Sequence, residues 1–299
     1  MTKRKHYRLK LKSGTLVLGE RTLVMGVLNV TPDSFSDGGK FFSLHRAVEA
    51  ALTMERDGAD ILDIGAESTR PGSTGISVAE ELARLLPVLQ ALDGRLKIPI
   101  SVDSQKARVA EIALGAGAQI LNDISGLQND ARMAEVAAKF RAPLILMHMR
   151  GTPRSMQKES FAKDVMKDVS RGLREAIARA RRAGVAKTQI ILDPGIGFGK
   201  SFAQNYELLA QLPQFAKLGC PLLLGTSRKG FLGATLGKKG KPMPPEERIW
   251  GTAATVTASI LNGAHIVRVH DVAEMAQVVR VSDCLLDPER GSGEKATKA

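Results

Sequence analysis

The chain has little of several residue types, and each shortage argues against a class of function. Among its 299 residues only 2 are cysteine, 1 is tryptophan and 2 are tyrosine. Cys220 and Cys284 have neither the spacing of a metal site nor the number that a disulfide framework needs, which fits a reducing compartment. Aromatic residues make up 4% of the chain, so a nucleic-acid surface built on base stacking is disfavoured.

Signals for export or membrane insertion are also lacking. The basic N-terminus is not followed by the apolar core of a signal peptide. The uncharged run from Trp250 to Val267 approaches the length of a transmembrane helix, but it contains glycines, threonines, Asn262 and His265. We interpret this run as a buried helix followed by a strand, and we expect a soluble, cytoplasmic protein that binds neither nucleic acid nor membranes.

Positive charge is abundant. Lysine and arginine number 43 against 31 aspartates and glutamates, a formal net charge of +12. Part of it lies at the N-terminus and part at Lys238, Lys239 and Lys241. We interpret most of this charge as solvated surface, and any focused part as an attraction for a small anionic substrate.

A short apolar segment followed by an amphipathic stretch recurs along most of the chain. Strands are expected at 23–30, 60–65, 98–103, 119–123, 143–148, 189–193, 221–226 and 265–270. Helices are expected at 43–57, 78–92, 105–116, 130–140, 162–183, 204–217, 246–262 and 272–285. Continuous apolar strands alternating with helices indicate a parallel sheet covered on both faces. Eight such units favour the α/β class and a closed (β/α)8 TIM barrel, with an open doubly wound sheet as the alternative.

The segments outside these units are assigned separately. Residues 7–20 alternate about Ser13 and Gly14 and predict a β-hairpin, which we expect to plug the N-terminal end of the barrel. The expected organisation is therefore a basic N-terminal segment with a hairpin over 1–21, a barrel over 22–286, and a polar, disordered tail over 287–299.

The glycine-rich stretch "DPGIGFGKS" at 193–201 ends like a nucleotide-binding phosphate loop. That motif needs a glycine at 194, where the chain has Pro194. Proline has no backbone N–H and a fixed φ, so it is poorly suited to an anion-binding loop. A dinucleotide fingerprint would need glycine at Lys200 or Phe202, and fails too. The stretch therefore draws attention to Asp193, the residue that ends the preceding strand.

Every expected strand is followed by polar or charged residues. They are Asn29; Asp63 with Glu67, Thr69 and Arg70; Asp103; Asn122 and Asp123; His148; Asp193; Ser227, Arg228 and Lys229; and Arg268 with His270. One such carboxylate alone is best explained as a helix cap. Because active sites of α/β barrels lie at the carboxyl ends of the strands, so many on one rim predict a site there.

The residue types on this rim indicate what it binds. There is no Ser-His-Asp order, and the histidines do not pair at the spacing of a transition-metal site. Carboxylates and carboxamides can hold the donor edge of a flat, nitrogen-rich heterocycle. Arg268 and His270 share one face of a strand, and with Asn29 they could hold a diphosphate and Mg²⁺. A ring together with a diphosphate suggests displacement of a diphosphate leaving group.

Eight blocks of the sequence resemble, in order, the signatures of the dihydropteroate synthase family. They are "NVTPDSFSDGG" (29–39), "DIGAESTRPGS" (63–73), "SVDS" (101–104), "LNDISG" (121–126), "MHMRGTP" (147–153), "DPGIGFGK" (193–200), "GTSRKGFLG" (225–233) and "RVHD" (268–271). The resemblance covers residues 22 to about 285. Ala66 and Ser104-Gln105 depart from the usual pattern, and neither departure removes a functional side chain.

This resemblance implies a transferase of folate biosynthesis, a sulfonamide target that uses Mg²⁺ and forms a homodimer. It would join p-aminobenzoate to 6-hydroxymethyl-7,8-dihydropterin diphosphate, giving 7,8-dihydropteroate and pyrophosphate. Loops 31–39 and 66–75 would close over the two substrates.

By motif position, the resemblance also implies a role for each site residue. The pterin would contact Asp103, Asn122, Asp193 and Lys229, with Met147 and Phe198 lining its slot. Asn29, Arg268 and His270 would hold the diphosphate, and Asn29 would be the metal ligand. Phe35, Thr69, Arg70, Pro71 and Ser227 would form the p-aminobenzoate site, with Asp37 from the first loop. The chemical step would depend on Asn29, Asp37, Lys229, Arg268 and His270.

Simpler explanations exist for some of these residues. Met147 and Phe198 could be packing residues, and His148 a structural histidine at a strand end. Asp63 and Glu67 could cap a helix or order a loop, so we do not expect them to be catalytic.

Two other functions are compatible with parts of the pattern. The pterin-binding barrel of corrinoid-dependent methyltransferases would share Asp103, Asn122 and Asp193, but it needs neither the first-loop block nor cations for a diphosphate. A non-catalytic pterin-binding paralogue would be expected to lose diphosphate or p-aminobenzoate residues.

Overall fold

The structure is a computed structural model that describes residues 4–31, 39–68, 72–152, 154–156 and 161–291. The strands are β1 (Tyr7–Leu11), β2 (Gly14–Leu18), β3 (Leu23–Asn29), β4 (Ile61–Gly65), β5 (Ile100–Asp103), β6 (Ile120–Asp123), β7 (Leu144–Met147), β8 (Ile190–Asp193), β9 (Leu223–Leu224) and β10 (Ile266–Val269).

Helices alternate with the strands from β3 onward. The α-helices are α1 (Gly39–Arg56), α2 (Val78–Leu92), α3 (Ala107–Gly115), α4 (Arg132–Phe140), α5 (Val165–Arg182), α6 (Phe202–Ala210), α7 (Gly230–Leu236), α8 (Ile249–Leu261) and α9 (Val272–Leu286). Short 3-10 helices are η2 (Lys187–Gln189), η3 (Leu212–Leu218), η4 (Pro245–Glu247) and η5 (Pro288–Gly291).

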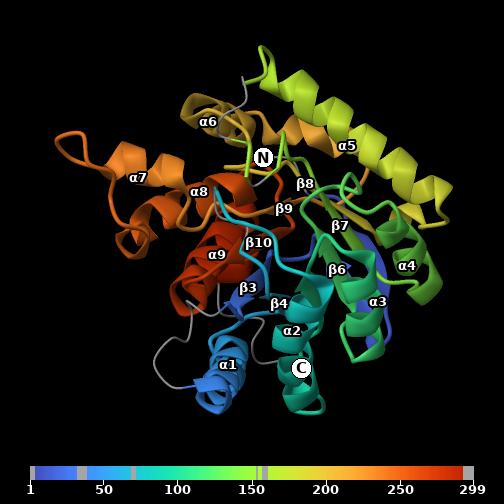
Figure 1. Ribbon diagram of the computed structural model, residues 1–299. Helices are drawn as coiled ribbons and strands as arrows, with labels where there is room; N and C mark the ends of the chain where they lie inside the picture. Colours follow the sequence, from blue (N-terminus) through green and yellow to red (C-terminus); the bar gives the residue numbers. More distant parts are fainter. Residues whose placement is uncertain (1–3, 32–38, 69–71, 153, 157–160, 292–299) are drawn as a thin grey trace.

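Eight parallel strands make one sheet in the order β8-β7-β6-β5-β4-β3-β10-β9. A parallel bridge between Leu192 and Leu222 joins its two edges, and the helices lie around the strands (Figure 1). The (β/α)8 TIM barrel predicted from the sequence is therefore confirmed, and the open sheet is excluded.

Side chains of the barrel strands alternate between the inside of the barrel and the helices around it. The inward residues near the strand starts form one buried cluster: Leu23, Met25, Ile61, Ile120, Ile145, Ile191, Leu223 and Ile266. Their neighbours in sequence, such as Leu62 and Leu192, belong to the cluster under the helices. Because the strand period is two residues, the position two beyond each inward residue faces inward again. Asp63, Asn122, Asp193 and Arg268 occupy that next layer.

Helix ends are fixed by local chemistry. Asp164 caps α5 by accepting from the backbone N–H of Lys167. Ser201 and Gln204 form a capping box at the start of α6, which satisfies two backbone donors that a helix leaves free. Helices α5 and α6 therefore start close to the positions expected from the sequence.

Three parts of the chain differ from the sequence prediction. The helix expected over 204–217 ends at Ala210, and η3 follows it, because Pro213 cannot donate an intrahelical hydrogen bond and crowds the preceding turn. Helix α7 was not predicted, since Gly230 and Gly233 lower the helix propensity of this stretch. Residues 288–291, placed in the tail by the sequence, form η5.

The β1–β2 hairpin covers the N-terminal end of the barrel. Leu9 and Leu18 are fully buried in the same cluster as the inward barrel residues. The side chain of Gln189 accepts from the backbone N–H of Lys10 at 2.9 Å and donates to its carbonyl at 2.8 Å. Gln119 accepts from the backbone N–H and the hydroxyl of Ser13. The predicted plug is therefore present, and it is bonded to the starts of two strands.

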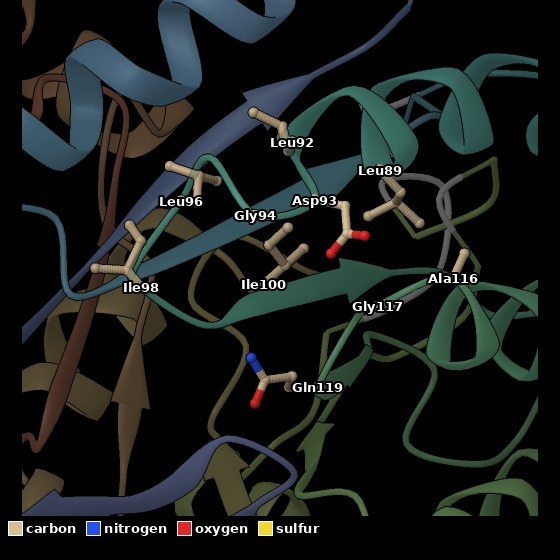
Figure 2. A pocket seen from close by; sticks show the side chains of 10 residues that line it. All are labelled: Leu89, Leu92, Asp93, Gly94, Leu96, Ile98, Ile100, Ala116, Gly117 and Gln119. Atoms are coloured by element: carbon tan, nitrogen blue, oxygen red, sulfur yellow. The ribbon is translucent and has the colours of Figure 1, made fainter.

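A small cavity lies at the same end of the molecule. It measures about 80 Å³ and is lined by Leu89, Leu92, Asp93, Gly94, Leu96, Ile98, Ile100, Ala116, Gly117 and Gln119 (Figure 2). These residues end α2 and α3 and begin β5, so the cavity is remote from the strand carboxyl ends.

Within the described residues, none of the helices is long and apolar enough to span a membrane.

The plug provides a stability test. Replacing Leu9 by alanine empties space in the barrel floor, and we expect a loss of about 2–5 kcal/mol in unfolding free energy. Thr15→Ala, an exposed change in the same hairpin, should stay within about 0.5 kcal/mol of the parent. Urea unfolding measures both, and equal stabilities of the two variants would show that the hairpin does not seal the core.

Candidate active site

Charged and polar side chains from several strands meet in the layer above the apolar floor. Arg268 of β10 donates from Nε to Asp63 of β4 at 2.7 Å and from Nη2 to Asp103 of β5 at 2.9 Å. Asn122 of β6 donates to the same Asp63 oxygen at 3.0 Å. The structure thus brings three predicted site residues together and adds Asp63 to them.

The sequence analysis did not expect Asp63 to be a catalytic residue. It has no exposed surface, and it caps no helix: its Oδ2 holds Arg268 and Asn122. Its Oδ1 has no hydrogen-bond partner among the described residues. The interpretation of Asp63 as a capping or loop-ordering residue was therefore wrong. A charged residue in the apolar strand sequence "ILDIG" was the available signal.

Burial decides the electrostatics of this cluster. It raises the pKa of the Asp103 carboxyl to about 7, against the lowering effect of Arg268 and with a further rise from Asp63. The Arg268 side chain is 21% exposed, so its guanidinium is held from inside the barrel while part of it faces the rim. At neutral pH the Asp103 carboxyl therefore lies close to its protonation change.

Asp193 ends β8 in a loop shaped by glycines. Its Oδ1 accepts from the backbone N–H of Gly195 at 2.7 Å. Burial raises the pKa of Asp193, and the hydrogen bond from Gly195 and the charges of Lys229 and Lys200 lower it. Gly195 and Gly197 have φ of +73° and +85°, which favours glycine. A Cβ at Gly195 would lie 1.9 Å from the carbonyl oxygen of His148.

Lys229 and Phe198 form the neighbouring part of the site. The Lys229 ammonium lies 3.9 Å from the centroid of the Phe198 ring. Burial, then Arg268, lowers the pKa of Lys229 to about 8. Met147 is buried with Ile124 and other apolar residues, against which Phe198 packs. Phe198 thus supports Lys229, and the packing role considered for Met147 fits its burial.

Ser227 and His270 are in direct contact. The Ser227 hydroxyl lies 2.9 Å from His270 Nδ1 and accepts from the His270 backbone N–H at 3.2 Å. Burial, then Arg268, lowers the pKa of His270 to about 3. The imidazole is therefore neutral at neutral pH and acts through hydrogen bonds, without the positive charge that an imidazolium would bring.

Asn29 stands at the end of β3 and is exposed. A Cβ at Gly65 would lie 3.8 Å from Asn29 Oδ1 and 3.7 Å from Asp103 Oδ2. The absence of a side chain at Gly65 therefore opens the space between these two groups. The Asn29 oxygen faces the same part of the rim as the carboxylate of Asp103.

Several predicted residues lie outside the described part of the chain: Phe35, Asp37, Thr69, Arg70 and Pro71. Residues that flank Thr69, Arg70 and Pro71 in sequence make side-chain contacts. Lys106 forms ion pairs with Glu67 at 2.6 Å and with the buried Glu81 at 2.5 Å, and Glu67 accepts from the backbone N–H of Ile76 at 3.1 Å. Glu67 thus connects Lys106 with the described residue Ile76.

His148 is a buried structural residue. Its Nε2 lies 3.7 Å from Asp168 of α5, and a Cβ at Gly172 of the same helix would overlap the imidazole. Burial, then Lys200, lowers the pKa of His148 to about 2. The ring packs against the outer helix, which matches the simpler explanation considered for it.

The Pterin binding enzyme family matches residues 25–270. The chain is 51% identical over 267 residues to the dihydropteroate synthase of Synechocystis sp., covering 89% of this chain and 91% of that protein. It is 48% identical over 276 residues to that of Bacillus subtilis, covering 92% and 93%. The chain belongs to the dihydropteroate synthase family.

Solved structures of dihydropteroate synthases share the fold. The Clostridium difficile protein, in the presence of pteroic acid, matches with a TM-score of 0.84 at 45% identity and covers 90% of this chain and 98% of its own. The Xanthomonas albilineans protein with 4-aminobenzoic acid has a TM-score of 0.86 at 40% identity, covering 95% and 99%. The Yersinia pestis protein in a sulfonamide complex matches with a TM-score of 0.86 at 43% identity, covering 94% and 99%.

The glycine loop provides a test of the site's construction. Gly195→Ala combines left-handed strain of about 1–2 kcal/mol with overlap on His148, which adds about 1–3 kcal/mol. Gly94→Ala is the matched control, because its φ is +69° but no atom lies within 4 Å of the new Cβ. Thermal unfolding should show a distinctly larger loss for Gly195→Ala, and equal losses would mean that the loop tolerates a side chain there.

Proposed function

We propose that this protein catalyses the condensation of 6-hydroxymethyl-7,8-dihydropterin diphosphate with p-aminobenzoate, giving 7,8-dihydropteroate and pyrophosphate. The observation that carries the proposal is the buried polar layer in which Arg268 joins Asp63, Asp103 and Asn122. This layer lies at the carboxyl ends of the strands, where such barrels perform catalysis. Membership of the dihydropteroate synthase family supports it.

The pterin is assigned to the carboxylate side of the layer. Asp193 uses Oδ1 for Gly195, and no described residue bonds to its Oδ2, which is left to accept from the donor edge of the ring. Asp103 and Asn122 are placed to accept from or donate to further ring atoms. Lys229 supplies a cation for a ring carbonyl, and Phe198 and Met147 supply apolar surface.

The diphosphate is assigned to the rim of β3 and β10. Nη1 of Arg268 has no hydrogen bond within the described chain, since Nε and Nη2 face Asp63 and Asp103. Because Arg268 is fixed by those carboxylates, it meets the diphosphate without reorganisation. The neutral imidazole of His270 contributes a donor through Nε2, since Nδ1 faces Ser227.

Mg²⁺ fits this donor set. The described residues contain no group of three or more metal-ligating side chains, and Mg²⁺ commonly uses one or two protein oxygens together with phosphate oxygens and water. Asn29 supplies such a hard oxygen at the rim. When bound, Mg²⁺ would neutralise charge on the diphosphate.

The p-aminobenzoate is assigned to Ser227 and to the loop residues Phe35, Thr69, Arg70 and Pro71, with Asp37 in the first loop. In the reaction the methylene C–O bond to the diphosphate breaks and a C–N bond forms to the arylamine, which then loses a proton to solvent. An arylamine is neutral at neutral pH, so no strong base is needed before attack.

We also propose a homodimer that uses the outer face of α8 and α9. Trp250, Val281 and Leu285 are 78%, 65% and 54% exposed there, and a groove of about 490 Å³ runs between the helices. Exposed apolar patches of this kind mark interfaces. Sedimentation velocity should show the mass of a dimer.

A cytoplasmic location is proposed as well, in keeping with the free thiols of Cys220 and Cys284.

The reaction itself is the test of function. Purified protein with both substrates and Mg²⁺ should release pyrophosphate and form dihydropteroate. Arg268→Lys keeps the charge but loses the planar fork, and Arg268→Ala loses both, so kcat/KM should fall in that order. The alanine change should cost about 3 kcal/mol of transition-state stabilisation.

Two controls separate the alternatives. Arg268→Ala should still bind a pterin without the diphosphate, as measured by calorimetry. A protein that binds pterin but forms no product would support the non-catalytic paralogue. Methyl transfer from a methylated tetrahydropterin would support the corrinoid-dependent class. Wild-type turnover in Arg268→Ala would remove the leaving-group assignment.

A further inference from the structure

Lys200, the lysine of the apparent phosphate loop, is buried beneath the glycine turn. Lys200 as a whole is 7% exposed. The ammonium donates to the carbonyl oxygens of His148 and Gly195, both at 2.8 Å. Its neighbour Ser201 caps α6. Both residues are therefore used within the fold, and the likeness to a nucleotide-binding loop is accidental.

The two carbonyls held by Lys200 belong to the segments that place Asp193. The N–H of Gly195 donates to Asp193 Oδ1 at 2.7 Å, so the carboxylate binds the N–H and the ammonium binds the carbonyl of the same glycine. The N–H of His148 donates to the carbonyl of Asp193 at 2.9 Å. Lys200 therefore joins the end of β7 to the turn after β8.

We propose that Lys200 is a positioning residue for pterin recognition, which fixes the Asp193 carboxylate through Gly195 and His148 and balances its buried charge. The inference rests on the proposed function, because that function assigns Asp193 to the pterin. Lys200 itself does not contact the substrate. Its effect is transmitted by backbone geometry and by charge.

The charges around Lys200 agree with this role. Burial raises the pKa of Asp193, and Lys200 is among the groups that lower it. Burial lowers the pKa of Lys200 to about 7, while Asp193 and Asp168 raise it and Lys229 lowers it. Arg268 also lowers the pKa of Asp193, and His148 is neutral. Removing the ammonium should therefore let Asp193 take up a proton at a higher pH.

The experiment is calorimetric binding of 6-hydroxymethyl-7,8-dihydropterin between about pH 5 and pH 8. Lys200→Met keeps an unbranched side chain without the charge. We expect its pterin affinity to fall about tenfold near pH 6, where the wild-type ammonium is charged, because a rise of about one unit in the pKa of Asp193 corresponds to that factor. Because the variant holds Asp193 less ionised, the pH below which binding is lost should move upward. The KM for p-aminobenzoate should change less than twofold.

Two controls make the result specific. Ser201→Ala loses the adjacent helix cap, so it should lower Tm modestly and leave the pH dependence of binding in place. Lys200→Arg retains the charge and should retain that pH dependence even if affinity falls. Should Lys200→Met not fold, Lys200→Gln takes its place. An unshifted pH dependence together with wild-type affinity in the uncharged variant overturns the inference.

Asp193→Asn, measured in parallel, separates this inference from the proposed site. Pterin binding equal to that of the wild type in Asp193→Asn would refute the site assignment itself. Weakened binding in Asp193→Asn with unaffected Lys200 variants would refute only the role of Lys200.

Discussion

The site depends on one buried guanidinium. Arg268 crosses the inside of the barrel from β10 to reach Asp63 and Asp103 on β4 and β5. Taking a charge out of water costs several kcal/mol unless hydrogen-bonding partners of opposite charge compensate it. Asp63 has no exposed surface at all, so it needs Arg268 as much as Arg268 needs a carboxylate. Each charge is tolerable only because the others are present.

This mutual dependence explains how the barrel divides its interior. The lower layer is apolar and sealed by Leu9 and Leu18 of the hairpin, so it supplies stability. The layer above is ionic, and its charges are incompletely neutralised. Burial moves the pKa of Asp103 to about 7 and that of Lys229 to about 8. Groups whose pKa is moved this close to neutral pH are typical of functional sites.

Much of the fold could be predicted from sequence because its signals are local. Apolar runs that alternate with amphipathic stretches predicted the barrel, and polar residues at the strand ends predicted the position of the site. The break at Pro213 and helix α7 were missed, because a Pro-containing helix pattern and a glycine-rich stretch are ambiguous without their neighbours. The roles of Asp63 and Lys200 could not be predicted either. Their partners lie far away in sequence, and only the closed barrel brings Arg268 to Asp63.

The resemblance to known enzymes supplied what physical reasoning alone left open. Residue types suggested a ring and a diphosphate, and the family membership identifies the class of reaction. The structure adds two contacts that neither gave: a hydrogen bond between the neutral His270 and Ser227, and an ion pair between Glu67 and Lys106.

A double-mutant cycle on Asp63 and Arg268 tests the central claim most directly. Unfolding free energies of Asp63→Asn, Arg268→Met and the double variant are measured by urea denaturation at pH 7. We predict that Arg268→Met costs about 3–5 kcal/mol, since it leaves the buried Asp63 without its counter-ion, and that Asp63→Asn costs less, since Arg268 keeps its ion pair with Asp103. The double variant should then be more stable than the sum of the two losses by at least about 2 kcal/mol. Losses that add to within about 0.5 kcal/mol would show that the two residues are energetically independent, and would contradict the account.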